Sequence, residues 1–199
     1  MPYSGEHKQK TRANIVEAAR ILFNRHGFGD VTIDMVMQEA GLTRGGFYNH
    51  FKSKESLFGE AVASFLMGRG AEWRADAGVD PMNPGPDIAR QMIEAYLSVD
   101  HLGDLDGQCP MIALPSDVAR SNPEVQASYQ GLLEAMVGLF ESGLGKETSQ
   151  SNFEARQKAL SLAALCVGGM VLARTLPDST LAEEVRIAAH HTANEMTMP

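Results

Sequence analysis

The feature that most constrains the fold of this chain is a pair of short helical patterns separated by a two-residue turn. The first pattern repeats apolar residues at the spacing of one helix face, namely Ile33, Val36, Met37 and Ala40. Thr32 is placed to cap this helix at its start, and Gly41 can take the left-handed conformation that ends it. We therefore expect a short helix over residues 33–40.

A second short helix follows at once. After Leu42, Thr43 can cap a helix that runs from Arg44 to His50. Helical spacing then places Phe47 and Phe51 together on the core side. Two short helices joined by so tight a turn, with a glycine in it, predict a helix-turn-helix.

Helical patterning dominates the rest of the chain, and no segment alternates convincingly as a strand does. Residues 11–26 show one apolar face, and Gly27 is placed to end that helix. A Pro/Gly loop spans 79–86, residues 107–122 are ambiguous with a short helix over 112–120, and a capping box formed by Thr180 and Glu183 starts the last helix. Further helices are expected over residues 53–78, 88–103, 125–143, 155–176 and 180–192. The predicted fold is all-α, with an N-terminal three-helix helix-turn-helix domain over residues 1–56 and a C-terminal helical bundle over residues 57–199.

Charge is distributed unevenly along the chain. The formal net charge is −8, but residues 1–60 hold eight Lys or Arg and seven Asp or Glu, whereas residues 61–199 hold nine and eighteen. An acidic body with a locally basic head would bind a polyanion only through the head.

Length and composition narrow the class of protein. A chain of 199 residues, 44% of them hydrophobic, can form a substantial core without a disulfide framework. Cys109 and Cys166 therefore fit the reduced thiols of a cytosolic protein. No signal peptide is recognisable at the N-terminus, and the longest apolar run, Leu162 to Ala173, is shorter than the roughly 18–20 residues that span a bilayer. We expect a cytoplasmic protein without a membrane segment.

The second short helix contains the side chains suited to contacts with DNA. It would expose Gly45, Tyr48 and Asn49, flanked by Arg44 and His50. The side chains among these include donors suited to phosphates and base edges, on a helix that fits the major groove of B-DNA. Gly45 and Gly46 each cost about 1 kcal/mol relative to alanine inside a helix, a cost that close approach of the backbone to DNA would explain. The alternative is that both lie in the first helical turn, where the cost is smaller.

Several stretches together resemble a known family. These are Phe23–Phe28, Thr32, Ala40–Thr43 and above all Gly46–Leu57, and they are similar to the N-terminal DNA-binding domain of the TetR family of transcriptional regulators. The resemblance covers residues 10–60 closely, and the remainder only as an all-helical regulatory domain. It implies a homodimeric repressor that places two recognition helices on a near-palindromic DNA operator and is released by a small-molecule inducer.

The resemblance also implies residue roles. Phosphate contacts are expected from Thr32, Thr43, Tyr48, His50 and Lys54, and contacts near base edges from Arg44, Gly45 and Asn49. Family members typically pair through their last two helices, and the segment with Gly168 and Gly169 would let another helix approach closely, although such a helix could simply be core. The dimer-interface residues expected on this basis are Ala163, Val167, Gly168, Val171, Val185 and Ala189.

The ligand-binding residues are inferred from bulky, adaptable side chains of the middle helices. A stripe of methionine and aromatic residues at helical spacing is also typical of plain core. The candidates are Trp73, Met92, Tyr96, Cys109, Met111, Tyr129, Met136 and Phe140, and they favour an apolar or aromatic inducer. Cys109 stands just before a helix start, which suits either an oxidant- or electrophile-sensing thiol or a buried lining residue.

Other chemistries find little support in the sequence. His190 and His191 precede Glu195 on the last helix, but two ligands are too few for a metal, and a solvated polar face is favoured. No Ser-His-Asp order, phosphate loop or paired-carboxylate motif stands out, so we expect no cofactor, no metal and no enzyme activity. The alternative function is a helical small-molecule-binding or protein-interaction module without specific DNA readout.

Overall fold

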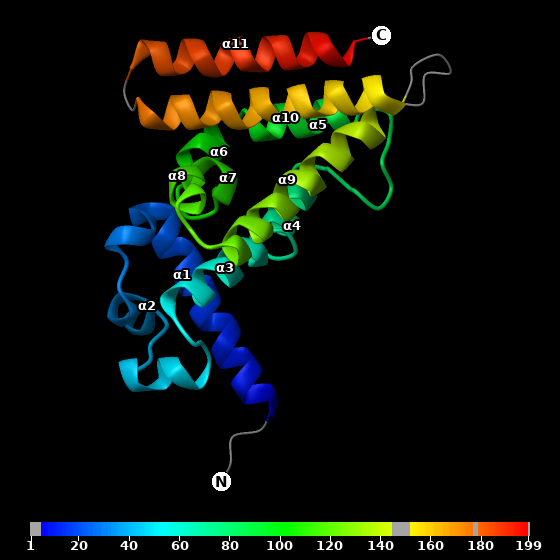
Figure 1. Ribbon diagram of the computed structural model, residues 1–199. Coiled ribbons are helices and arrows are strands. Elements are labelled where there is room, and N and C mark those ends of the chain that lie inside the picture. The colour runs from blue at the N-terminus through cyan, green and yellow to red at the C-terminus, as the bar shows by residue number, and fades with distance from the viewer. Residues whose placement is uncertain (1–4, 145–151, 177–178, 199) are drawn as a thin grey trace. The chain divides into compact units, whose positions relative to one another are not determined.

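The fold is all-α, as the sequence predicts. The computed structural model describes residues 5–144, 152–176 and 179–198, and within these ranges the regular elements are all helices (Figure 1). In chain order they are α1 (Gly5–Asp30), α2 (Ile33–Glu39), the 3₁₀ helix η1 (Arg44–Asn49), α3 (Lys54–Ser64), α4 (Arg69–Asp76), α5 (Ile88–Tyr96), α6 (Val99–Gly103), α7 (Pro110–Ala113), α8 (Pro115–Ala119), α9 (Pro123–Gly143), α10 (Asn152–Thr175) and α11 (Thr180–Thr197).

The chain divides into two compact units. The first contains the described residues up to Gly68 together with Leu105–Gln130, and the second contains Arg69–Asp104 together with the described residues after Gln130. Helix α9 therefore begins in the first unit and ends in the second. The predicted boundary between residues 56 and 57 stays a prediction.

The first three helices follow the local signals of the sequence. Gly27 has a φ of 75° and interrupts the helical backbone of α1, and Gly41 has a φ of 69° in the turn after α2. Thr32 accepts a hydrogen bond from the Met35 backbone N–H at 3.2 Å, and Ser53 accepts one from Ser56 at 3.1 Å. These caps and glycines confirm the predicted starts of α2 and α3 and the predicted break at Gly27.

Aromatic rings form the core that holds α1 to α3. The Phe58 ring lies 4.9 Å from those of Phe23 and Phe28 between centroids. Phe47 and Phe51 are both buried, with centroids 5.6 Å apart, as their spacing predicts. The two clusters fix η1 against the rest of the helix-turn-helix.

Three of the predicted helices begin or are interrupted at residues other than those that the sequence predicts. The expected helix over 53–78 is broken after Ser64, and the expected helix over 88–103 is broken at Leu97 and Ser98. Ser98 causes the second break because its Oγ accepts the backbone N–H of His101 at 3.0 Å and starts α6. The capping box at Thr180 was wrong by one residue, since Ser179 caps α11 by accepting the Leu181 N–H at 3.2 Å.

The ambiguous segment before α9 contains two one-turn helices. Pro110 opens α7 and Pro115 opens α8. Proline suits the first position of a helix because it lacks only an N–H that has no partner there, and its fixed φ is already helical. The single short helix expected over 112–120 is thus divided at Leu114.

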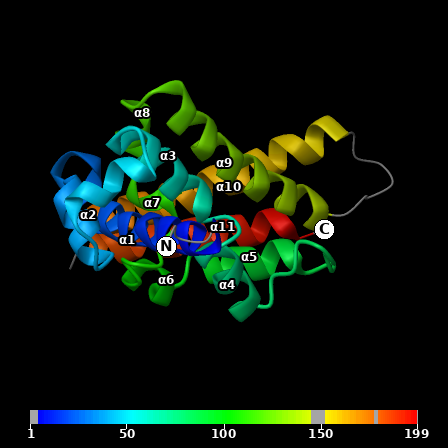
Figure 2. The same ribbon diagram turned by 90° about the horizontal axis from the view of Figure 1, so that it is seen from below.

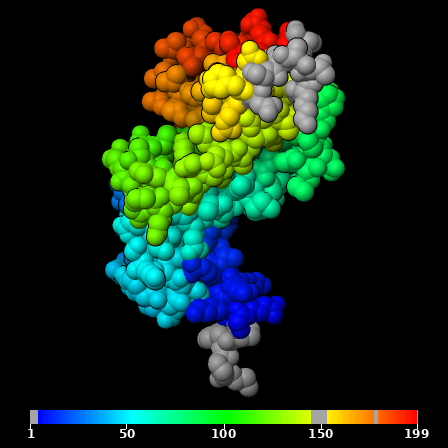
Figure 3. Space-filling model, turned by 45° about the vertical axis from the view of Figure 1, so that its right-hand side comes forward, coloured from blue at the N-terminus to red at the C-terminus, as the bar shows by residue number. Residues whose placement is uncertain are grey.

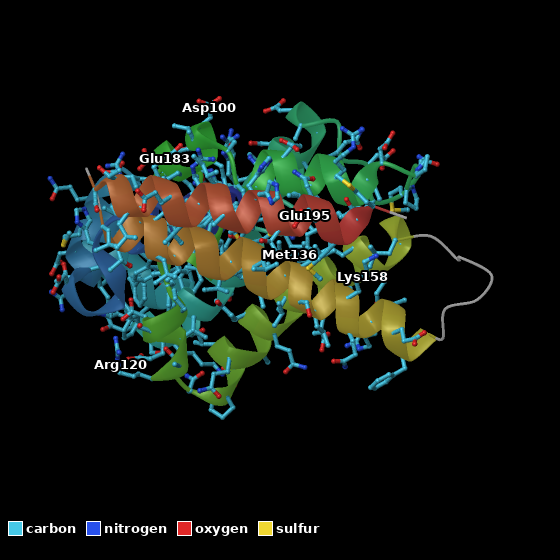
Figure 4. The ribbon with its side chains drawn as sticks, turned by 90° about the horizontal axis from the view of Figure 1, so that it is seen from above. Asp100, Arg120, Met136, Lys158, Glu183 and Glu195 are labelled. Atoms are coloured by element: carbon cyan, nitrogen blue, oxygen red, sulfur yellow. The ribbon has the colours of Figure 1, made fainter. Side chains whose placement is uncertain are left out.

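The last two helices run antiparallel, side by side (Figures 1 and 4). Helix α10 is long and apolar enough to cross a membrane by length and composition, and it is longer than the apolar run seen in the sequence. However, Leu162, Cys166 and Met170 on it are fully buried in the protein, so part of its apolar surface packs against other helices. A Cβ added at Gly169 would stand 2.6 Å from the Ala189 Cβ, so this glycine permits the close approach of α11.

We predict that Gly169→Ala lowers the free energy of unfolding by about 1–3 kcal/mol, because the added methyl group overpacks the α10–α11 contact. Gly138→Ala in α9 is the matched control, since Gly138 is exposed, a Cβ there would meet no atom within 4 Å, and the position lies outside the predicted dimer interface. It should leave stability unchanged or raise it by up to about 1 kcal/mol through helix propensity. Urea unfolding at one fixed protein concentration measures both, and equal effects of the two variants would contradict the packing role of Gly169.

Candidate DNA-binding surface and ligand-binding residues

The helix-turn-helix is closed by backbone hydrogen bonds in its turn. The Leu42 N–H donates to the Met37 carbonyl at 2.8 Å, and the Gly46 N–H donates to the Thr43 carbonyl at 3.0 Å. The second bond winds η1 as a 3₁₀ helix. The same bond occupies the Gly46 N–H, which a capping Thr43 hydroxyl would otherwise accept. The predicted side-chain cap at Thr43 is therefore absent.

Helix η1 buries one residue and exposes several. Phe47 is fully buried, whereas Arg44, Gly45 and Asn49 are exposed and Tyr48 is 63% exposed. The segment around these residues lies at the surface in the space-filling view (cyan in Figure 3). Side chains with hydrogen-bond donors thus stand on an exposed helix next to α2, as DNA readout requires.

The two glycines of η1 differ in their surroundings. A Cβ at Gly46 would lie 3.5 Å from the Met37 side chain, so Gly46 borders α2. A Cβ at Gly45 would meet no atom within 4 Å. Packing inside the domain therefore gives no reason for glycine at position 45, whereas an approaching DNA backbone or base would.

Two predicted contacts already have partners inside the domain. Arg44 forms an ion pair with Asp34 of α2. The Lys54 ammonium donates to the carbonyls of Phe28 at 2.7 Å and Val31 at 2.8 Å, and it lies 4.1 Å from the centre of the Phe28 ring. Lys54 thus connects the start of α3 to Phe28 at the end of α1 and to Val31 just after it. Its phosphate contact stays a prediction.

His50 is half-buried at the end of η1. Its carbonyl accepts a hydrogen bond from Arg12, which also pairs with Glu60 and lies 4.1 Å from the centre of the Phe51 ring. Burial, followed by the charges of Lys8 and Arg12, lowers the pKa of His50 below its ordinary value. These effects favour the neutral imidazole of His50 over its protonated form.

Sequence reasoning missed a set of polar contacts between α1 and the segment before α8. Arg25 pairs with Asp106 through two hydrogen bonds, and Arg20 donates to the carbonyl of the same residue. Asn24, which is buried, donates to the Gln108 carbonyl at 2.7 Å. The residues lie more than 80 positions apart, so no local pattern in the sequence could indicate the pairing.

The family model for bacterial regulatory proteins of the tetR family matches residues 15–61. This range contains α2, η1 and most of α3. Residues 15–61 of this chain are therefore similar to the N-terminal domain of the tetR-family regulators.

Relatives among known regulators match the same region. The uncharacterized HTH-type transcriptional regulator YfiR of Bacillus subtilis is 43% identical over 61 residues, which are 31% of this chain and 30% of that protein. AcrR of Shigella flexneri is 38% identical over 55 residues, 28% of this chain and 26% of that protein. The chain therefore aligns with about a third or less of the length of these TetR-type relatives.

Solved structures resemble the fold of nearly the whole chain. A TetR transcriptional regulator from Chloroflexus aurantiacus has a TM-score of 0.76 and 22% identity, covering 96% of this chain and 97% of its own. Reduced Escherichia coli NemR has a TM-score of 0.73 and 16% identity, covering 94% and 96%. At these identities the similarity establishes the fold.

The predicted dimer-interface residues divide by exposure. Ala163 and Ala189 are buried, and Ala189 lies against Gly169 of the same chain. Val167, Gly168, Val171 and Val185 are half-buried. Exposed apolar side chains also stand on the same two helices, among them Leu160, Leu172 and Leu181.

The predicted ligand-binding residues fall in both units. In the second unit, the rings of Trp73 and Tyr96 lie near each other and near His101, whose ring centroid is 4.7 Å from Trp73 and 5.1 Å from Tyr96. No pattern in the sequence singles out His101. Three further candidates of this unit, Met92, Met136 and Phe140, are buried.

In the first unit, the candidates Cys109, Met111 and Tyr129 form a second group. The Tyr129 hydroxyl donates to the Met111 carbonyl at 3.2 Å. Burial, with a smaller contribution from Cys109, raises the pKa of Tyr129 to about 12. Cys109 is buried as well, so this group offers apolar surface and a neutral phenol.

We predict that burial of His101 makes unfolding depend on pH. Burial, with a smaller contribution from Arg69, lowers the pKa of His101 from 6.5 to about 4, and Asp104 opposes this shift. Between these two pH values the unfolded chain binds a proton that the folded chain does not, so stability falls as the pH falls from 6.5 to 4. The loss should reach about 3 kcal/mol.

The pH dependence of urea unfolding tests this assignment. His101→Phe keeps an aromatic ring beside Trp73 and should flatten the slope between pH 6.5 and 4. His26→Phe, at an exposed position of α1, is the control and should retain it. An unchanged slope in His101→Phe would contradict the role given to His101.

Proposed function

We propose that this chain is a DNA-binding transcriptional regulator of the cytoplasm, and that it represses by binding a near-palindromic operator as a homodimer. A small-molecule inducer then releases it from DNA. The observation that carries the proposal is the exposed face of η1, where Arg44, Gly45, Tyr48 and Asn49 stand in the segment that the tetR-family model matches. The relatives matched there are described as transcriptional regulators, which favours regulation over catalysis.

Arg44 is the residue we assign to base readout. An arginine can donate two hydrogen bonds to the O6 and N7 atoms of guanine in the major groove. Its present partner is Asp34, and both side chains are more than half exposed. Exposed ion pairs of this kind contribute little, so the exchange of Asp34 for a base costs little.

Phosphate contacts fix the position of the helix on DNA without selecting sequence. Thr32, Thr43 and Tyr48 are exposed and present hydroxyl groups for this role. His50 adds a neutral donor, and the charge of Lys54 adds to the field at the start of α3 while its ammonium stays on the two carbonyls. We therefore expect Lys54 to contribute less affinity than its charge alone would suggest.

We predict that Arg44→Ala relaxes the sequence preference of the protein. Selection of bound duplexes from a random library should enrich a palindrome with the parent protein. With the variant, the base pair that Arg44 contacts should accept other bases, because each half-site loses about 1–3 kcal/mol of discrimination between bases. Arg90→Ala is the matched control, because Arg90 is also exposed and also paired with one aspartate, Asp87, in the other unit.

The same selection discriminates the proposal from its alternative. No enrichment by a folded parent dimer would contradict DNA readout and favour a helical small-molecule-binding or protein-interaction module. Equal relaxation in Arg44→Ala and Arg90→Ala would instead reject the base contact assigned to Arg44.

Dimerisation is proposed through α10 and α11. A near-palindromic operator needs two recognition helices spaced about 34 Å apart, and a twofold dimer supplies them. The half-buried Val167, Gly168, Val171 and Val185 lie on helices that expose further apolar side chains. Coverage of this surface by a second copy would remove the apolar area from water.

We predict that Val185→Glu produces a monomer, since a charge would enter an apolar interface without a partner. Ile187→Glu is the matched control on the same helix, because Ile187 is exposed beside α5 and outside the predicted interface set. Sedimentation at micromolar concentration distinguishes the two. A monomeric parent protein, or a monomer only in Ile187→Glu, would contradict the proposed interface.

The inducer is proposed to be apolar or aromatic. The Trp73, Tyr96 and His101 rings offer stacking surface, and His101 carries no charge at pH 7 because of its lowered pKa. One similar structure, SmeT, is a complex with triclosan (TM-score 0.65, 21% identity, 94% of this chain and 91% of that chain). Cys109 is 2% exposed, which favours a lining role over reaction with an electrophile or oxidant.

A further inference from the structure

Two stretches of the first unit contain basic residues and no acidic ones. Residues 7–16 and residues 40–54 each hold three of the 17 Lys and Arg residues of the chain, and neither holds any of its 25 Asp and Glu residues. The predicted DNA contacts include residues of the second stretch, which contains the turn and η1, but none of the first. The first stretch belongs to the early part of α1, where Lys8 and Lys10 are exposed and have no assigned role.

Two hydrogen bonds join these stretches in space. The Arg12 guanidinium donates to the His50 carbonyl at the end of η1. The Asn14 amide donates to the Ala40 carbonyl, 2.8 Å away, just before the turn. Figure 2 shows α1 beside α2, the helix that leads into the turn. The early part of α1 therefore holds both ends of the segment that contains the turn and η1, and the two basic stretches belong to one surface.

Arg12 positions the parts of this surface, and its own charge is compensated. It forms an ion pair with Glu60 of α3, and its guanidinium lies 4.1 Å from the centre of the Phe51 ring. Its side chain thus connects α1 with the end of η1 and with α3. The positive charge that the early part of α1 adds to the surface comes from its two exposed lysines.

Helix geometry places only one of these lysines on the side of α1 that faces η1. Lys8 precedes Arg12 by four residues, which is about one turn, so the two side chains share a face of the helix. The charge of Lys8 also contributes to lowering the pKa of His50, after the larger effect of burial. Lys10 precedes Arg12 by two residues and is therefore turned about 200° away from that face. Lys8 stands near His50, and Lys10 points elsewhere.

The surroundings of Lys8 suit a phosphate group. Cations gathered without acidic neighbours repel one another, whereas a bound polyanion turns the same charges into attraction. His50 is itself a predicted phosphate contact, and Lys8 lies on the helix face beside it. A lysine fits this role because its ammonium, at the end of a flexible chain, binds phosphate as a point charge.

We propose that Lys8 is a further DNA contact of this chain and binds the backbone phosphate next to His50. The inference rests on the proposed function, because it takes η1 as the helix that enters the major groove. Lys8 then adds affinity without adding sequence preference, since phosphate contacts carry no base identity. The DNA-binding surface thereby includes the early part of α1 as well as the helix-turn-helix.

The test is the salt dependence of binding to DNA. The full-length, tag-free protein is titrated against a fluorescently labelled pool of random-sequence duplexes at a series of KCl concentrations. Lys8→Gln should lower the slope of log Kd against log salt by about 0.9 per bound chain, because one phosphate contact is lost. Lys10→Gln is the matched control, since it removes the same charge from the other face of the same helix, and it should keep the parent slope. Lys8→Arg should keep the parent slope as well.

A second measurement needs no DNA. In Lys8→Gln the loss of a neighbouring positive charge should raise the pKa of His50, as followed by NMR, whereas Lys10→Gln should leave that pKa unchanged. Both substitutions replace an exposed residue within α1. Glutamine favours a helix about as well as lysine, so both variants should fold.

The proposal is overturned if Lys8→Gln keeps the parent slope, if Lys10→Gln lowers the slope equally, or if the pKa of His50 does not respond to Lys8→Gln. Selection of a palindrome tests the regulatory function separately. A Lys8-dependent slope without enrichment of a palindrome would reject sequence readout and support the contact of Lys8. A parent protein that binds no duplex at low salt would reject both.

Discussion

The contact between α1 and residues 106–117, the segment that contains α7 and the start of α8, is the interaction on which the rest of the first unit depends. Arg25 and Arg20 hold Asp106, and the Phe28 N–H donates to Asp117 Oδ2 at 3.1 Å. This segment leaves the second unit at Asp104 and returns to it at Gly131. This segment is therefore joined covalently to the second unit at both of its ends, and its residues bind the helix that leads into the helix-turn-helix.

Gly27 makes this contact possible. With a φ of 75° it ends the regular part of α1 and presents the next N–H to Asp117. A Cβ at this position would lie 3.1 Å from the same Asp117 oxygen, in a conformation that side chains disfavour. Gly27 thus serves two purposes. It ends the helix, as the sequence pattern predicts, and it permits the contact with Asp117, which the pattern cannot indicate.

The difference between these two purposes explains which parts of the structure could be predicted. The caps at Thr32 and Ser53 and the turn at Gly41 act within four residues, so the sequence specifies them and the helix-turn-helix follows. The break at Ser98 is equally local, but the apolar pattern runs across it and conceals it. Lys54 reads as an exposed cation because its two carbonyl partners lie 23 and 26 positions away.

The winding of η1 determines which of its side chains share a face and could contact the same base edge of DNA. In a 3₁₀ helix, residues three apart share a face, so Phe47 lies on the side of Arg44, and Tyr48 on the side of Gly45. In the structure Phe47 is fully buried, whereas Arg44 and Tyr48 are both more than half exposed, so both of these side chains reach solvent in the 3₁₀ winding.

An α-helical winding would instead align residues four apart and bring Tyr48 onto the side of Arg44. The two windings therefore present different pairs to a base edge, Gly45 with Tyr48 or Arg44 with Tyr48. The two glycines lower the cost of changing between them, because each permits a wide range of backbone angles. Glycine at position 45 is required by no internal contact, and it permits either winding.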